Sequence, residues 1–158
     1  MTHQEGIARC ITAILAQDDE TVSAFRRGNP FDKLLRSYDE FNSKGGPLYR
    51  NARAVKHYKM SVRAFQSGMS GKELYGEHRI SLNVIIKQLL NSDRTYNSVL
   101  EILRSNEVIL ITDEERKYLD ESISKGGCGL RSKMPKDGRC RLVVGMIEIA
   151  PETLQNNL

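Results

Sequence analysis

Apolar side chains recur at helical spacing over much of the chain, so the pattern predicts a mostly helical protein. Ile7, Ile11 and Leu15 fall on one face of a first helix that Thr2 can cap. Gly and Pro residues separate this helix from further short amphipathic segments. Helices are predicted to begin at or near Thr2, Asp18, Pro30, Pro47, Ser81, residue 94 and Thr112.

Two apolar, β-branched runs near the C-terminus predict strands instead. The first is 107–111, and Thr112 and Glu115 directly behind it form a capping box that starts a helix. The second run is 140–149. The two strands are expected to pair, which gives a small two-stranded or slightly larger sheet backed by helices.

Length and composition fit one ordinary globular domain. The chain has 158 residues, of which 39% are hydrophobic and 28% charged, so it can bury a core without disulfides or metals. The sequence therefore predicts a single, mostly helical α+β domain over 1–158, with 150–158 as a frayed tail. It shows neither a signal-peptide pattern nor an apolar run approaching ~20 residues, so we expect a cytoplasmic protein with no membrane partner.

The positive charge is unevenly distributed. The net charge is +4, and basic residues concentrate in 51–79 and 125–150, on either side of an acidic middle. On a predicted long helix over about 47–67, four of the basic residues share one face as a stripe. Two basic regions could together bind a polyanion such as nucleic acid, with DNA as the first candidate, although a solvated surface explains them equally simply.

The candidate nucleic-acid-binding residues come from both basic regions. They are Arg53, Lys56, Lys59 and Arg63 of the stripe, together with Arg79, Lys125, Arg131, Lys133 and Lys136. The last four lie in a Gly-containing loop over 125–139. This loop is not a nucleotide-binding P-loop, because a helix is predicted before it and a strand after it. It could contact a nucleic-acid backbone or simply be solvated.

One short motif indicates a chemical activity. The segment Glu77-His78-Arg79-Ile80-Ser81-Leu82 places an acid and a histidine at the start of a short extended piece. It resembles the corresponding element of the HNH (ββα-metal) endonucleases. In that family the histidine is the general base that activates water, and a divalent metal stabilises charge on the phosphate.

The resemblance implies a set of site residues. His78 would be the general base and Asn97 would orient it, while Glu77 and Asn106 would hold a divalent metal, Mg²⁺ or Mn²⁺. Asn97 and Asn106 are separated by eight residues, as in the family pattern. The sequence departs from the family at Ser81, where proline is usual, and in the predicted helix that follows.

The sequence thus favours a nucleic-acid-binding protein, with HNH-like, metal-dependent endonuclease activity as the sharper hypothesis. Two alternatives stay open. The protein could bind nucleic acid without catalysis. It could instead be a non-enzymatic protein-interaction module, such as an inhibitor, an immunity factor or a structural subunit. The contact face of such a module would be acidic: Asp113, Glu114, Glu115, Asp120 and Glu121.

Overall fold

The computed structural model describes residues 1–27, 30–40, 58–131 and 133–154. These residues form helices and a small three-stranded mixed sheet, which confirms the predicted α+β class. The chain forms two compact units. We call Met1–Gly46 with Leu82–Asn106 the helical unit, and Pro47–Ser81 with Glu107–Leu158 the sheet unit. The single domain over 1–158 stays a prediction. In the described part of the chain, every helix is too short or too polar to cross a membrane.

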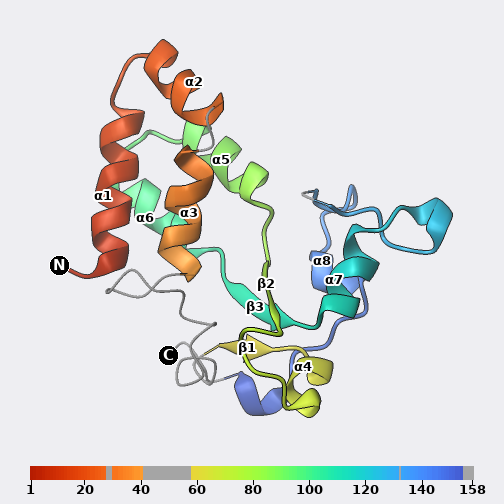
Figure 1. The fold of residues 1–158 in the computed structure, drawn as a ribbon. Helices are drawn as coiled ribbons and strands as arrows, with labels where there is room; N and C mark the ends of the chain where they lie inside the picture. The colour runs from red at the N-terminus through yellow and green to blue at the C-terminus, as the bar shows by residue number, and fades with distance from the viewer. Residues whose placement is uncertain (28–29, 41–57, 132, 155–158) are drawn as a thin grey trace. The chain divides into compact units, whose positions relative to one another are not determined.

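The helical unit contains the helices predicted to begin near Thr2, Asp18, Pro30, Ser81 and residue 94. Its helices are α1 (His3–Leu15), α2 (Asp19–Arg27), α3 (Pro30–Glu40), α5 (Leu82–Asn91) and α6 (Tyr96–Arg104). Thr2 caps α1 as expected: Glu5 N–H donates to the Thr2 hydroxyl, and Thr2 N–H donates to the Glu5 carboxylate. Helix α1 packs against α3 and α6, as Figure 1 shows.

The apolar faces of these helices meet in one core. Its side chains are almost fully buried, and they include Ile11, Leu15, Phe31, Leu35, Ile85, Leu89, Val99 and Leu103. Polar contacts reinforce the packing, since Arg9 stacks 4.8 Å above the Tyr96 ring and His3 Nε2 lies 2.9 Å from the Ser37 carbonyl oxygen. Burial of the apolar faces therefore accounts for the assembly of this unit.

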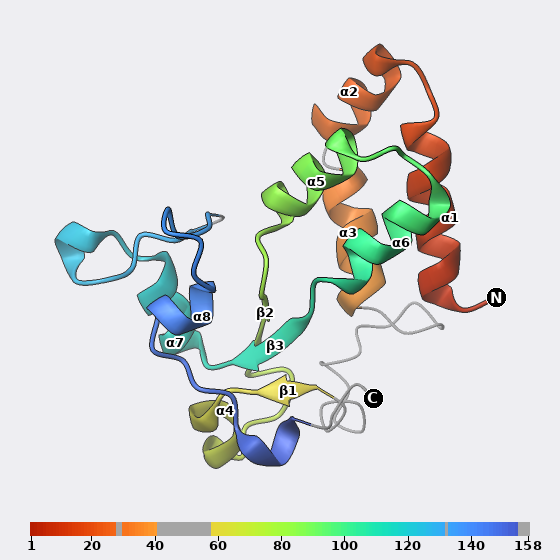
Figure 2. The same cartoon turned by 180° about the vertical axis from the view of Figure 1, so that it is seen from behind.

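The sheet unit is built around one buried strand. Its elements are β1 (Lys59–Met60), α4 (Val62–Ser67), β2 (Tyr75–His78), β3 (Val108–Ile111), α7 (Asp113–Asp120), η2 (Ile123–Lys125), α8 (Arg141–Val144) and η3 (Pro151–Thr153). Strand β3 lies in the middle, parallel to β1 and antiparallel to β2 (Figure 2). Every residue of β3 is buried. The predicted strand at 107–111 and the capping box at Thr112 and Glu115 are thus confirmed.

The predicted strand over 140–149 is wrong. Its first residues form the short helix α8, and only Ile149 makes an isolated antiparallel bridge, to Ser61. The single helical turn of α8 allows both Leu142 and Ile147 to pack into the core that contains Leu119. Tertiary packing overrides the β-propensity of the run here.

The long helix predicted over about 47–67 is wrong at 58–61, while 47–57 lies outside the described residues. Lys59 pairs with Ile109 in the sheet, and the following helix α4 has only six residues. Ser61 begins that helix, because its hydroxyl accepts a hydrogen bond from Ala64 N–H at 3.0 Å. Lys59 and Arg63 therefore do not share a helical face.

Most of the predicted tail is packed against the sheet unit. Ala150 N–H donates to the Met60 carbonyl at 2.8 Å, and Met60 N–H donates to the Thr153 hydroxyl at 3.0 Å. Ala150 and Thr153 are both buried. Fraying is thus wrong for 150–153, and 155–158 lie outside the described residues.

Candidate functional site

A buried ion pair joins strand β2 to helix α8, which follows the predicted basic loop over 125–139. Glu77 on β2 forms an ion pair with Arg141, the first residue of α8, and the two side chains are only 6% and 5% exposed. Arg141 Nη2 also donates to the Leu130 carbonyl at 2.9 Å. Burial raises the pKa of the Glu77 carboxyl, although the positive charge of Arg141 opposes this shift. The Glu77 carboxylate is thus engaged in a structural contact.

His78, the predicted general base, ends strand β2 opposite Val108 and is 6% exposed. Asn97 is exposed on α6, and Asn106 is buried. Glu77 and His78 belong to the sheet unit, whereas Asn97 and Asn106 belong to the helical unit, so neither unit contains the whole predicted set.

The predicted metal ligands, Glu77 and Asn106, are likewise divided between the two units. Residues 1–27, 30–40, 58–131 and 133–154 contain no group of three or more His, Cys, Asp or Glu side chains arranged to hold a metal ion. The HNH-like site with Mg²⁺ or Mn²⁺ stays a prediction, and the burial of Glu77 and His78 lends it no support.

The structure separates the predicted basic residues into distinct groups. Arg53 and Lys56 lie outside the described residues. Lys59 Nζ and Arg79 Nη1 both bind the Glu107 carboxylate, at 2.9 and 2.7 Å. Burial disfavours the charged form of Glu107, but the hydrogen bonds from these two cations outweigh it and lower its pKa. Arg63 is exposed on α4.

The remaining candidates lie in the basic loop, residues 122–139, which we call the cation loop. Lys125, Arg131, Lys133 and Lys136 are all exposed, and none forms an ion pair with any residue that the structure describes. The loop's other cation, Arg139, binds Asp137 at 2.7 Å. Because Asp137 is the loop's single acidic residue, the loop presents a surplus of positive charge.

Backbone contacts anchor the cation loop to the rest of the sheet unit. Leu130 is buried in the core of the sheet unit, and its N–H donates to the Leu119 carbonyl at 2.8 Å. At Gly127 the chain passes so close to helix α7 that an added Cβ would lie 2.4 Å from the Glu121 carbonyl oxygen. Together with the Arg141 hydrogen bond to Leu130, these contacts fix the loop at several points. No local sequence signal indicates this anchoring, since Arg141 stands among the basic residues of 125–150.

The acidic residues of the rival hypothesis are mostly engaged within the protein. Asp113 and Asp120 both bind Arg116, at 2.7 and 3.4 Å. Glu115 is buried, and it accepts hydrogen bonds from Ser61 Oγ at 2.6 Å and from Thr112 N–H at 2.9 Å. This surface therefore presents less free negative charge than its composition indicates.

The chain matches no protein-family model, no curated protein and no solved structure. The fold and the site define it as an α+β protein with an anchored, exposed cation loop beside a small mixed sheet.

Proposed function

We propose that the protein binds nucleic acid through the phosphate backbone, with the cation loop as the contact surface. The observation that carries this proposal is the set of four exposed cations, Lys125, Arg131, Lys133 and Lys136, which have no acidic partner among the described residues. A cation paired one-to-one with a carboxylate gains little from a phosphate, whereas an unpaired one can displace a condensed counterion.

The anchoring of the loop supports the same function. Ordering a flexible loop on binding costs conformational entropy, and this cost is reduced where the loop is already fixed. Leu130 and Gly127 fix the cation loop before any ligand arrives. Phosphate contacts alone position a protein on nucleic acid without selecting a sequence, so the binding is expected to be sequence-independent.

The proposal contains no catalytic step. The groups that the endonuclease hypothesis needs, Glu77 and His78, are buried, and Glu77 is bound to Arg141. The protein-interaction hypothesis needs an open acidic face, whereas Asp113, Glu115 and Asp120 are engaged in internal contacts. Binding without catalysis is therefore the alternative that the geometry supports best.

The test is a fluorescence-anisotropy titration of labelled duplex DNA, repeated with single-stranded DNA and RNA over a salt series. Each phosphate contact contributes about 0.9 to the slope of log affinity against log salt on duplex DNA. We expect Arg131→Gln and Lys133→Gln each to lower that slope by about one. Lys72→Gln, which removes an exposed cation outside the loop, should leave the slope unchanged. Equal effects of all three variants would refute the assignment to the loop.

A further inference from the structure

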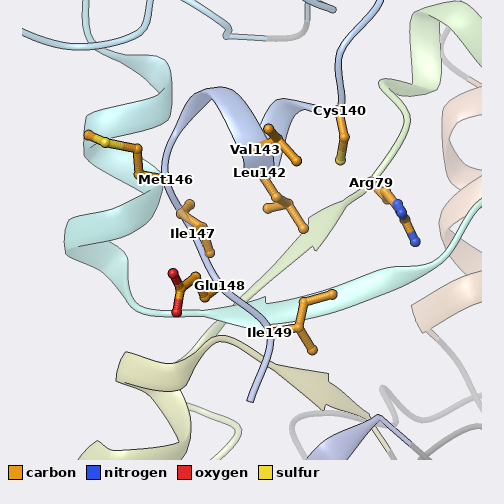
Figure 3. Close-up of a pocket in the computed structure, with 8 residues that line it drawn as sticks. All are labelled: Arg79, Cys140, Leu142, Val143, Met146, Ile147, Glu148 and Ile149. Atoms are coloured by element: carbon orange, nitrogen blue, oxygen red, sulfur yellow. The ribbon is translucent and has the colours of Figure 1, made fainter. Parts of the chain in front are cut away.

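The sheet unit contains a hollow whose lining includes none of the cation loop's four unpaired cations. This hollow has a volume of about 630 Å³, and it is lined by α8, the segment that follows it, and Arg79 (Figure 3). Pockets of this size commonly hold small organic molecules. Its lining residues are Arg79, Cys140, Leu142, Val143, Met146, Ile147, Glu148 and Ile149.

The lining is mainly apolar, and part of it faces water. Leu142 and Ile147 are buried, at 3% and 7% exposed, and they form the inner wall. Val143 and Met146 are 60% and 77% exposed. Met146 also has a positive φ of 52°, a backbone conformation that costs energy for a residue other than glycine. An apolar hollow with exposed Val and Met beside it is typical of a ligand-binding surface.

One end of the hollow carries an excess of positive charge. Arg79 shares the single carboxylate of Glu107 with Lys59, so this group of three side chains has one cation more than it has anions. The Arg79 side chain is 47% exposed, and its Nη1 binds Glu107. Glu148 lies near Ile147, at the opposite end of the lining from Arg79, as Figure 3 shows. An anionic group is therefore favoured at the Arg79 end.

We propose that this hollow binds a small aliphatic carboxylate. The hydrocarbon chain lies against Leu142, Ile147 and Ile149, and the carboxylate accepts hydrogen bonds from Arg79. Burial of the chain provides the affinity, and Arg79 provides the preference for an anion. This site is independent of the proposed nucleic-acid binding, because it uses none of Lys125, Arg131, Lys133 or Lys136.

The test compares decanoate with decanol by isothermal titration calorimetry on the full chain. We expect decanoate to bind more tightly than decanol. Arg79→Gln should weaken decanoate binding by about tenfold or more while leaving decanol binding unchanged, because only the carboxylate accepts a charge-assisted hydrogen bond from Arg79. Val143→Glu, at an exposed position, should weaken the binding of both ligands.

Three results would overturn the proposal. The first is equal affinity for decanoate and decanol in the wild-type protein. The second is a loss of decanoate binding in the loop variant Lys133→Gln, which would place the anion on the cation loop instead. The third is a concentration-dependent dimer in sedimentation velocity that Val143→Glu disrupts, which would assign the hollow to a second copy of the chain. Circular dichroism checks that the Arg79→Gln, Lys133→Gln and Val143→Glu proteins are folded before their binding is compared with that of the wild-type protein.

Discussion

Glu77 and Arg141 form an ion pair beneath the surface of the sheet unit, and through it the base of the cation loop is attached to strand β2. Arg141 completes the attachment by donating to the Leu130 carbonyl within the loop. A contact that holds a binding loop is expected to affect both stability and binding.

Removal of Arg141 should destabilise the protein strongly. In Arg141→Leu the Glu77 carboxylate stays buried without its guanidinium partner, and such a change costs about 3–5 kcal/mol of unfolding free energy. The double variant with Glu77→Leu should recover most of this loss, because no buried charge is then left unpaired. Urea denaturation measures the unfolding free energy of the wild-type protein, of Arg141→Leu and of the double variant. Lys117→Leu, which breaks an exposed pair with Asp113, is the control with a much smaller effect.

The Glu107 carboxylate should make stability depend on pH in the acid range. Burial disfavours its charge, but hydrogen bonds from Lys59 and Arg79 hold its pKa below the ordinary value of 4.5. The unfolded chain therefore binds the proton more readily, so this contribution to stability is present above pH 4.5 and is lost as the pH falls through the folded-state pKa. Glu107→Gln should flatten the acid side of the stability profile, measured by thermal unfolding. Glu114→Gln, at an exposed position, should leave the profile unchanged.

Gly127 should tolerate no side chain. A Cβ at this position would lie 2.4 Å from the Glu121 carbonyl oxygen, so Gly127→Ala must displace the cation loop from α7. We expect a loss of about 1–3 kcal/mol in unfolding free energy, as for other overpacked sites. Gly6→Ala, in helix α1 with open space around it, should instead stabilise by about 0.5–1 kcal/mol. A Gly127→Ala protein as stable as wild type would contradict the described path of the loop.

The endonuclease hypothesis leads to a separate experiment. Plasmid is incubated with the purified protein and Mg²⁺ or Mn²⁺, and wild type is compared with His78→Ala and Asn97→Ala. Because His78 is buried at the end of β2, we expect the three proteins to give the same background level of cutting. Metal-dependent cutting that His78→Ala abolishes would contradict binding without catalysis and support the HNH-like site.

Local signals in the sequence predicted the local structure well. The Thr2 cap, the Thr112 capping box, Pro30 at the start of α3 and the buried strand β3 all depend on residues close together in the chain. Such features are determined by hydrogen bonds and periodicity over a few residues, and a sequence displays them directly.

Features that depend on distant partners could not be predicted in this way. Lys59 lies in a strand because it pairs with Ile109, and Leu142 lies in a helix because it packs against the core with Leu119. The Glu77–Arg141 pair likewise joins residues far apart in sequence, so Glu77 looked like a ligand and Arg141 like a surface cation. The exposed charges at Lys125, Arg131, Lys133 and Lys136 agree with the expectation from the sequence, because hydrophilic side chains in a loop seldom find buried partners.

The hydrogen bond from Met60 to Thr153 spans 93 positions of the chain, and it has a consequence for biosynthesis. Residues up to α6 can leave the ribosome and assemble while the rest is still being translated, since domains generally fold as they emerge. Strand β1 must wait for both β3 and Thr153. During that interval Met60 of β1 and the preceding Tyr58, which are buried in the folded protein, are accessible to chaperones, and ribosomal pausing before Thr153 would prolong their exposure.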